Sequence, residues 1–599
     1  MSTYMNRTTP GVYLTEFSAF PNSIPGVATA IPAFIGYTER CDISGKQALF
    51  TPILINSLAD YTAIFGDEFN AVYDMADKDK DGTAYDAENS DFSSQVWNAT
   101  DAKYETTYYV FTRSESTFKR KPEDARSNRL DADDEEFSET PLLKDEFAAK
   151  PGLAAYNLYN SLRMFYANGG GTCYVVSVGL FSATGGVSYD DLSKGLTAIG
   201  EQVGPTMLVI PDAVLLPADA PPTDPPPQPG YMPTSATYKK LCGDMLAQCA
   251  ALQDRIAIFD VYGTQDLDPK SPNYTTELNN VIANFQEAVG ETNLNYGMAY
   301  FPFLITSIIQ PGEITYLNYS TGPLQTILKD EAAWLYPPED PANAAPDKDD
   351  NPTYVTLKRW IESISDAKNR DTTTAEGLGR ITTLNQNLVN GIPNYKQMTN
   401  VLAYVMSMLP PSGAMAGIFT ANDATRGVWN APANVVLNSV VQPSIKLNGA
   451  QQGPLNVPIN GKAIDVIRDF VGRGPVVWGA RTLDGNSLDF RYIQVRRTLI
   501  YCESSIKTAL NQFVFAPNDG KTWVAVVAMV SAFLRNLWAQ GGLMGDKPDE
   551  AFTVQCGLGS TMTGTDILNG YMVVQVTLAM IRPAEFIELT FKQKMEGVA

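Results

Sequence analysis

The sequence predicts a multidomain α/β protein, with mixed α+β character, in which helices and strands alternate after residue 150. The chain has 599 residues, which at roughly 150 residues per domain suggests about four folding units. Apolar residues make up 44% of it and charged residues 18%, a balance typical of chains that bury large cores. Regular alternation of strand-like and helix-like segments favours a largely parallel sheet with helical crossovers.

The alternation begins with a helix predicted in the segment 153–167, LAAYNLYNSLRMFYA. Leu158, Leu162 and Phe165 recur on one helical face, and the glycine-rich run at 168–171 ends that helix. A buried strand is then predicted at 173–178. The same pair of elements recurs along the chain, with helices predicted at 190–204, 238–255 and 279–291 and strands at 207–210, 256–259 and 297–301.

Charge and the absence of histidine exclude several classes of function. The chain has 44 Lys and Arg against 66 Asp and Glu, a net charge of −22, which repels phosphate backbones, so no nucleic acid partner is expected. It has no histidine, which removes Ser-His-Asp and Cys-His nucleophiles and imidazole metal ligands. We expect no enzyme activity, although carboxylate-based glycosidase chemistry stays open because acidic residues are plentiful.

The cysteines and the apolar stretches point to the cytoplasm. The six cysteines form no CxxC pair, so we expect buried reduced thiols at Cys41, Cys173, Cys242, Cys249, Cys502 and Cys556. The longest nearly uncharged apolar stretch, 523–534, is shorter than the roughly 20 residues of a bilayer crossing. The N-terminus lacks a basic region followed by an apolar one. We therefore expect synthesis in the cytoplasm and no direct membrane insertion.

Two regions interrupt the alternation. Residues 67–150 include the run DADDEEFSE and are predicted to be a surface insertion with a solvated acidic segment. Residues 217–233 and 336–352 are dense in proline, which predicts extended loops or linkers in place of helix or central strand.

The last third of the chain combines a long apolar helix with strand-like ends. A helix is predicted at 521–539 because apolar residues recur there at three- and four-residue spacing, and a strand is predicted at 571–581. Both chain ends alternate with period two, and the residues concerned are Val12, Tyr13 and Leu14 near the start and Ile587, Leu589 and Phe591 near the end. Such terminal strands can pair within one molecule or with a neighbouring copy, and the period alone favours neither.

A short acidic motif predicts a structural calcium ion. The segment DKDKDGTAYDAE fits the pattern D-x-[DN]-x-[DN]-G-x5-E of a calcium loop. Its oxygen ligands would come from Asp77, Asp79, Asp81, Thr83 and Glu88. An acidic surface loop without an ion is the alternative, and no other metal or cofactor is expected.

Several sequence blocks resemble the sheath protein of contractile phage tails and of related extracellular injection systems. The first blocks are TPGVYLTEF, GVATAIPAFIGYTER and DYTAIFG. The middle of the chain adds NGGGTCYVV at 168–176 and IPDA at 210–213. The C-terminal third adds LPPSGAMAGIFTANDATRGVWNAPANVVLNSV, FVGRGPVVWGARTL, RYIQVRRTLIYCESSIKTAL and IRPAEFIELTFKQK. Together these blocks span residues 8–66, 151–310 and 405–594.

The resemblance implies a domain plan in which both chain ends serve assembly. Residues 1–30 would form an N-terminal arm and the start of an inner domain that residues 405–580 complete. Residues 31–404 would form an outer α/β domain, with insertions at 67–150 and in the proline-containing region 311–404. Residues 581–599 would form a C-terminal arm strand, and both arms would add to the sheets of neighbouring subunits.

The same resemblance implies a function. The protein would polymerise as a helical sleeve around an inner tube in a metastable extended state and contract to drive the tube through a target envelope. Its partners would be copies of itself, the inner tube protein, and baseplate and terminal cap proteins, in a phage tail or tail-like particle released from the cell. Arg535 and Lys547 would face the tube. A static surface-layer or adhesin protein is the alternative, beside the glycosidase.

Overall fold

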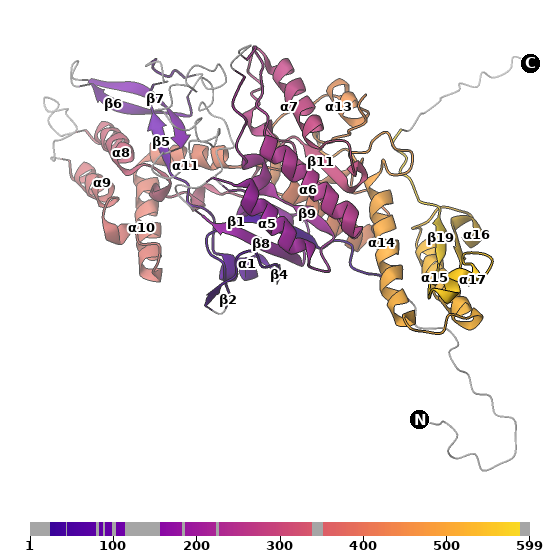
Figure 1. Ribbon diagram of the computed structural model, residues 1–599. Helices are drawn as coiled ribbons and strands as arrows, with labels where there is room; N and C mark the ends of the chain where they lie inside the picture. Colours follow the sequence, from indigo (N-terminus) through magenta and orange to yellow (C-terminus); the bar gives the residue numbers. More distant parts are fainter. Residues whose placement is uncertain are drawn as a thin grey trace, which may run out of the picture. The chain divides into compact units, whose positions relative to one another are not determined.

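The computed structural model describes residues 24–43, 45–78, 83–87, 90–98, 103–113, 156–181, 186–222, 227–337 and 351–586 (Figure 1). The chain divides into two compact units, one of residues 28–497 and one that joins residues 1–27 to 498–599. We call these the large unit and the terminal unit. The domain boundaries expected from the sequence, at 30, 404 and 580, stay a prediction.

The large unit is built on a nine-stranded sheet whose order is β14-β17-β16-β11-β10-β9-β1-β8-β4. Its parallel strands are β1 (Pro32–Thr38), β8 (Cys173–Leu180), β9 (Met207–Val209), β10 (Ile256–Asp260), β11 (Gly297–Phe301) and β16 (Asp465–Phe470). Three strands pair antiparallel, and these are β4 (Ile53–Ile55), β14 (Val435–Val436) and β17 (Gly474–Val477). The predicted mixed fold with a largely parallel sheet is confirmed.

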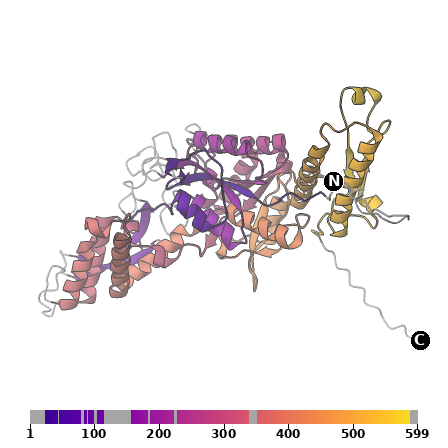
Figure 2. The same cartoon turned by 90° about the horizontal axis from the view of Figure 1, so that it is seen from below.

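Helices cover both faces of this sheet because successive residues of a strand point in opposite directions. From β1, Phe34 packs edge-on against Phe165 of α4 (Leu158–Ala167) with ring centroids 5.3 Å apart. The next residue, Ile35, lies beneath Gly195 of α5 (Tyr189–Gly200) on the other face. Contacts place α12 (Ser412–Arg426) beside α4 and place α6 (Ala236–Leu252) beside α5 and α7 (Tyr274–Ala288). Figure 2 shows the two helical layers from a second direction.

A second core in the large unit, which we call the lobe, combines residues 69–111 with residues 308–406. Its sheet has the order β5-β7-β6, from β5 (Tyr73–Ala76), β7 (Lys103–Arg113) and β6 (Phe92–Asn98). Its helices are α8 (Thr321–Leu335), α9 (Pro352–Ser363), α10 (Ala375–Gly391) and α11 (Pro393–Met406). Figure 1 shows these helices and strands together.

The lobe corrects one expectation from the sequence. Within the described parts of 73–113, expected to belong to a surface insertion, Tyr73, Phe92 and Phe111 are at most 3% exposed and pack in the lobe core. The acidic run that suggested solvation, at 131–139, lies outside the described residues. The proline-containing region 311–404 is likewise largely helical where it is described. The parts of 217–233 that the structure describes contain neither α-helix nor strand, as predicted.

The base of the lobe is a small antiparallel sheet of order β13-β12-β15. It contains β12 (Leu304–Thr306), β13 (Met408–Leu409) and β15 (Val440–Pro443). The backbone N–H of Thr306 donates to the carbonyl of Ser407 at 3.0 Å. The segments that lead into and out of the helical part of the lobe are therefore held side by side.

The smaller elements of the large unit are α1 (Leu58–Phe65), β2 (Asp42–Ile43), β3 (Lys46–Gln47) and α13 (Gly449–Asn456). All six cysteines of the chain are free, and five are buried, as predicted. Cys556 is only partly buried, which corrects the expectation for that residue. Burial raises the pKa of Cys173 to about 12, so this thiol stays protonated at neutral pH.

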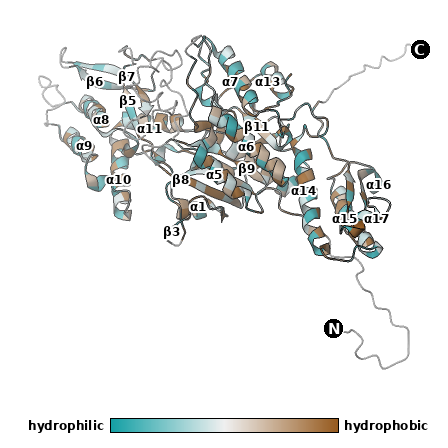
Figure 3. Ribbon diagram, in the orientation of Figure 1, coloured by the Kyte–Doolittle hydropathy of each residue, from teal (hydrophilic) through white to brown (hydrophobic). Residues whose placement is uncertain are grey.

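The terminal unit contains most of α14 (Ile493–Leu510), together with α15 (Gly520–Ala539), α16 (Pro548–Ala551), α17 (Gly564–Leu568), β18 (Phe552–Gln555) and β19 (Gln575–Leu578). Asp519 caps α15 by accepting a hydrogen bond from the backbone N–H of Thr522 at 2.9 Å. The predicted helix at 521–539 is confirmed, whereas the predicted strand at 571–581 is shorter. In Figure 3 the apolar residues along α15 are coloured brown.

By length and composition α15 could cross a membrane. This corrects the sequence estimate, which counted only 523–534. One such helix is weak support for a membrane span, because the core helix of a soluble protein has the same properties. In the structure α15 buries Val526, Met529, Val530, Phe533, Leu534 and Leu537.

Candidate assembly site

The terminal unit contains an isolated two-stranded sheet with one apolar face. β18 and β19 pair antiparallel, with Phe552 opposite Leu578 and Val554 opposite Val576. These four side chains are half-buried, while the residues between them are exposed. Contacts place α15 against β18, so the apolar face has a helix to pack on. An isolated pair of strands is marginally stable in water, and further strands or a packed helix stabilise it.

Both outer edges of this sheet are open in the part of the chain that the structure describes. Among the strands described there, β18 pairs only with β19, and just past the end of β19 Met580 forms a single antiparallel bridge with Leu543. The N–H of Ala579 donates to the carbonyl of Ala551, which fixes which residues of β19 face β18. Because antiparallel strands alternate inward and outward backbone groups, those of Val576 and Val554 point outward. Each edge can therefore accept one additional strand.

The terminal unit also contains several exposed apolar side chains. On the face of α15 away from its buried stripe, Val524 is 70% exposed. Phe515 and Leu568 are 103% and 88% exposed. The other exposed large apolar residues described in this unit are Val514, Met544, Leu558, Tyr571, Val573 and Phe586.

The structure describes only some of the residues that were predicted to take part in assembly. Arg535 of α15 and Lys547, which precedes α16, are both exposed in the terminal unit. Their contact with a tube stays a prediction. The arm residues Val12, Tyr13, Leu14, Ile587, Leu589 and Phe591 lie outside the described residues.

The predicted calcium loop is described only at its margins. Asp77 and Thr83 are described, and Asp79, Asp81 and Glu88 are not. The carbonyl of Asp77 accepts a hydrogen bond from the N–H of Tyr85, and the neighbouring residues form a single β-bridge. The loop follows strand β5 and precedes strand β6. Calcium binding therefore stays a prediction.

Sequence reasoning missed a buried ion pair where the chain leaves the large unit. Arg497, its last residue, pairs with Asp423 of α12 at 2.6 Å, and its guanidinium also donates to the carbonyl of Thr29. On the other side of the boundary, Ser505 accepts a hydrogen bond from the N–H of Val27. In each unit the N-terminal segment is thus bonded to α14. Arg497 lies in the block RYIQVRRTLIYCESSIKTAL. Its role as a buried ion-pair partner becomes visible only when its contacts with Asp423 and Thr29 are known.

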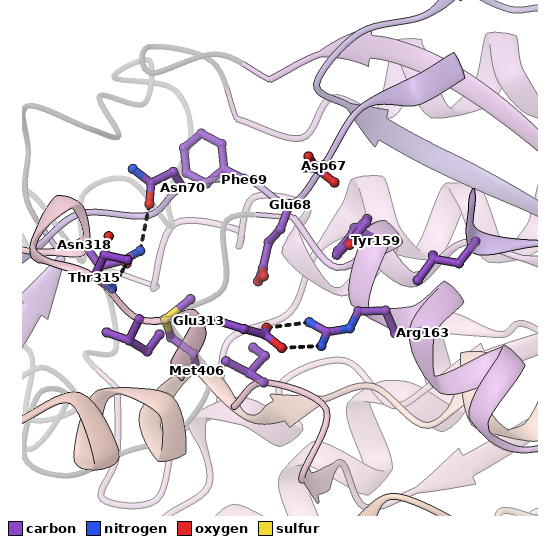
Figure 4. Close-up of a pocket in the computed structure, with 13 residues that line it drawn as sticks. Asp67, Glu68, Phe69, Asn70, Tyr159, Arg163, Glu313, Thr315, Asn318 and Met406 are labelled. Atoms are coloured by element: carbon purple, nitrogen blue, oxygen red, sulfur yellow. Dashed lines mark hydrogen bonds and ion pairs between the residues drawn. The ribbon is translucent and has the colours of Figure 1, made fainter. Parts of the chain in front are cut away.

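A polar cavity of about 450 Å³ lies where the lobe meets α4 (Figure 4). Arg163 of α4 donates to both carboxylate oxygens of Glu313 at 2.9 and 2.7 Å and to the carbonyl of Ile308 at 2.6 Å. Nearby, Glu68 accepts a hydrogen bond from the Asn160 amide at 2.6 Å. Burial raises the pKa of Glu68, and this hydrogen bond opposes the rise. These charged groups bind other parts of the protein and join the lobe to the sheet layer.

Comparison with known proteins finds a described domain family in the C-terminal part of the chain. The phage tail sheath C-terminal domain family matches residues 486–594, which include every helix and strand of that unit after α14 begins. The tail sheath protein of Burkholderia phage BcepMu is 29% identical over 143 residues. Residues 486–594 are thus similar to the C-terminal domain of phage tail sheath proteins. The match with the phage protein covers 23% of this chain and 30% of that relative.

Solved structures show a likeness in fold over nearly the whole chain. The anti-feeding prophage helical sheath in the contracted state gives a TM-score of 0.51 at 23% identity and covers 98% of this chain and 100% of that one. A chain of the six-fold symmetrised anti-feeding prophage baseplate gives 0.50 at the same identity and coverage. At this identity the likeness is one of fold.

Proposed function

We propose that this protein is the subunit of a contractile sheath, which polymerises helically around an inner tube in a metastable extended state. On contraction the sleeve would drive the tube through a target envelope. The observation that carries the proposal is the sheet of β18 and β19, open at both edges within the region that matches the sheath family. The sheet has two open edges, and each subunit has two strand-like chain ends. The N-terminal end of one neighbouring copy and the C-terminal end of another would each add a strand to one edge.

The energy source in this proposal is the assembled lattice. No nucleotide or other cofactor is needed if the contracted lattice gains contacts in each subunit. A gain of about 1 kcal/mol per subunit, the net value of about one hydrogen bond, becomes large when many subunits convert together. The exchanged strands would keep neighbours connected while the units of each subunit rearrange. The protein would act as a structural motor and not as an enzyme.

The partners follow from the same proposal. Copies of this chain would form the sleeve, an inner tube protein would fill it, and baseplate and terminal cap proteins would close its ends. The sheath and baseplate structures of the anti-feeding prophage support the sleeve of like subunits and the baseplate partner. Arg535 and Lys547 would meet the tube. The subunit would be made in the cytoplasm and built into a phage tail or tail-like particle that the cell releases.

Electron microscopy of the protein expressed with its tube protein tests the proposal. Striated sleeves of two diameters are the expected result. A single fixed lattice would favour a static surface-layer or adhesin protein, and dispersed particles with hydrolytic activity would favour a glycosidase. Deleting residues 1–15 or 585–599 should leave soluble monomers. Sleeves of normal length from either truncated chain would contradict strand exchange.

Calcium at residues 77–88 is a separate part of the proposal. The oxygen-rich spacing of Asp77, Asp79, Asp81, Thr83 and Glu88 supports it. Titration calorimetry should show heat of calcium binding that Asp77→Ala removes. If the unmutated protein gives no binding heat, the loop holds no ion.

A further inference from the structure

The lobe contains an uncharged groove on its helical side, separate from the terminal unit. Its volume is about 540 Å³, within the range of about 300–1,000 Å³ typical of ligand sites. The groove lies between the end of α8, one face of α9 and the last turn of α10. Its lining residues are Tyr336, Pro352, Thr353, Thr356, Leu357, Trp360, Asn387, Asn390 and Gly391.

We propose that this groove binds a neutral saccharide between the aromatic rings of Tyr336 and Trp360 and the carboxamides of Asn387 and Asn390. This binding site is additional to the proposed role in the sheath and does not depend on it. The chemical class of the ligand follows from three features of the lining, which are its charge, its rings and its amides.

The lack of charge excludes ionic ligands. None of the nine residues that line the groove is an acid or a base, in a chain of net charge −22. Phosphates, metal ions and strongly charged peptides are bound by charged side chains or by several aligned backbone N–H groups. The lining that the structure describes therefore suits a neutral ligand.

The aromatic rings of Trp360 and Tyr336 give the groove flat apolar surfaces, and each ring also carries one polar group. Trp360 and Tyr336 are partly buried against the lobe core, and both line the groove with the surface that they leave exposed. Indole N–H donates, and phenol O–H both donates and accepts. A sugar ring offers the matching surfaces, since its C–H bonds form an apolar face and its hydroxyls form a polar rim. Amphipathic aromatic side chains suit ligands of this kind.

The amides supply hydrogen bonds in both directions. Asn387 and Asn390 are three residues apart on α10, a spacing that places them on one helical face. Each carboxamide has two donors and one acceptor oxygen, which suits hydroxyl groups that also do both. The side-chain polar atoms of Asn387, Asn390, Trp360 and Tyr336 make no hydrogen bond within the part of the chain that the structure describes. They are therefore available to a ligand.

A glycine keeps the floor of the groove open. A Cβ atom at Gly391 would lie 2.5 Å from Cδ2 of Leu357 and 3.7 Å from Cζ3 of Trp360. Leu357 is 2% exposed and packs in the lobe core, so it cannot readily move away. Any side chain at position 391 would therefore displace the wall on which Trp360 rests.

Titration of the full chain with neutral oligosaccharides tests the proposal. The probes are cellohexaose, maltohexaose and chitohexaose, followed by tryptophan fluorescence and saturation-transfer NMR. We expect saturable binding of at least one probe. Trp360→Ala should weaken it about tenfold or more, and Asn390→Ala about three- to tenfold, the loss of one or two hydrogen bonds.

Trp334→Ala is the matched control. Trp334 lies on α8 of the same lobe, is 45% exposed and does not line the groove. Its substitution should leave sugar binding unchanged. The proposal is overturned if no probe binds saturably, if Trp334→Ala weakens binding as much as Trp360→Ala, or if a proline-rich peptide binds the groove and the sugars do not. Normal sleeves formed by Trp360→Ala would separate this result from the sheath proposal.

Discussion

Arg497 and Asp423 form a buried two-point ion pair, with Nη1 to Oδ1 at 2.9 Å and Nη2 to Oδ2 at 2.6 Å. Their side chains are only 3% and 6% exposed. The guanidinium also lies 4.7 Å from the centre of the Phe419 ring and donates to the carbonyl of Thr29 at 3.0 Å. One side chain thus holds α12, the start of α14 and the N-terminal segment together at the edge of the large unit.

Asp423→Ala should therefore destabilise the large unit. The change leaves Arg497 buried without a counter-charge, which typically costs about 3–5 kcal/mol. Urea unfolding followed by circular dichroism measures the effect. Glu287→Ala is the control, because Glu287 pairs with Lys239 at the surface, where a pair contributes about 0–1 kcal/mol. Equal losses in the two variants would show that the buried pair has no special weight.

Gly417→Ala should also destabilise the large unit, because the added methyl group would clash with a neighbouring helix. A Cβ atom at this position would lie 2.5 Å from the backbone oxygen of Phe165, where α12 crosses α4. Backbone cannot yield as a flexible side chain does, so a cost of about 1–3 kcal/mol or more is expected. The unfolding midpoint measures it.

Gly379→Ala is the matched control for the helix crossing. Gly379 lies inside α10, and a Cβ atom there would meet nothing within 4 Å. Alanine favours helix over glycine by about 1 kcal/mol, so this variant should be as stable as the original protein or more so. A loss of stability at Gly379 similar to that at Gly417 would contradict the packing argument.

The buried carboxyl of Asp260 should make stability depend on pH. It accepts hydrogen bonds from the N–H and hydroxyl of Ser412 at 2.7 and 2.5 Å, and burial raises its pKa to about 7. Because the folded state holds the proton more tightly than the unfolded state, this group stabilises most below about pH 4. That contribution falls as the pH rises toward 7 and is constant above it.

Asp260→Asn tests this dependence, because the amide cannot titrate. The urea midpoint of the original protein should fall between pH 5 and pH 8 by more than that of the variant. Asp489→Asn, at an exposed position, should keep the original pH dependence. If Asp260→Asn shows the same fall as the original protein, the carboxyl does not titrate in this range.

Local pattern predicted individual strands and helices in both units well. The strand at Cys173–Leu180 and the helix at Gly520–Ala539 follow from apolar periodicity, which depends only on neighbouring residues. The lobe sheet was missed because the acidic composition of 67–150 outweighed the strand-like segment KYETTYYVFTR at 103–113. Its buried aromatic residues find their partners in helices more than two hundred residues later.

Long-range partners explain the rest of what the sequence did not reveal. β1 lies between β8 and β9, whose residues are more than a hundred positions away, and no local pattern sets that order. Asp423 and Arg497 are separated by 74 residues, and each alone looks like an ordinary surface charge. The lobe groove likewise joins residues from three helices. Family resemblance supplied the assembly hypothesis, and the open edges of β18 and β19 give it a physical basis.

Val576→Pro and Val554→Pro should each prevent sleeve assembly. The N–H groups of these residues point away from the β18–β19 pair, so proline removes donors only from the open edges. The monomers should fold, as judged by circular dichroism and gel filtration. Val576→Ala and Val554→Ala are the controls, because alanine shortens the same side chains but keeps the N–H groups, and these variants should still assemble. Sleeves from the proline variants as abundant as those from the alanine variants would show that neighbouring strands do not add to these edges.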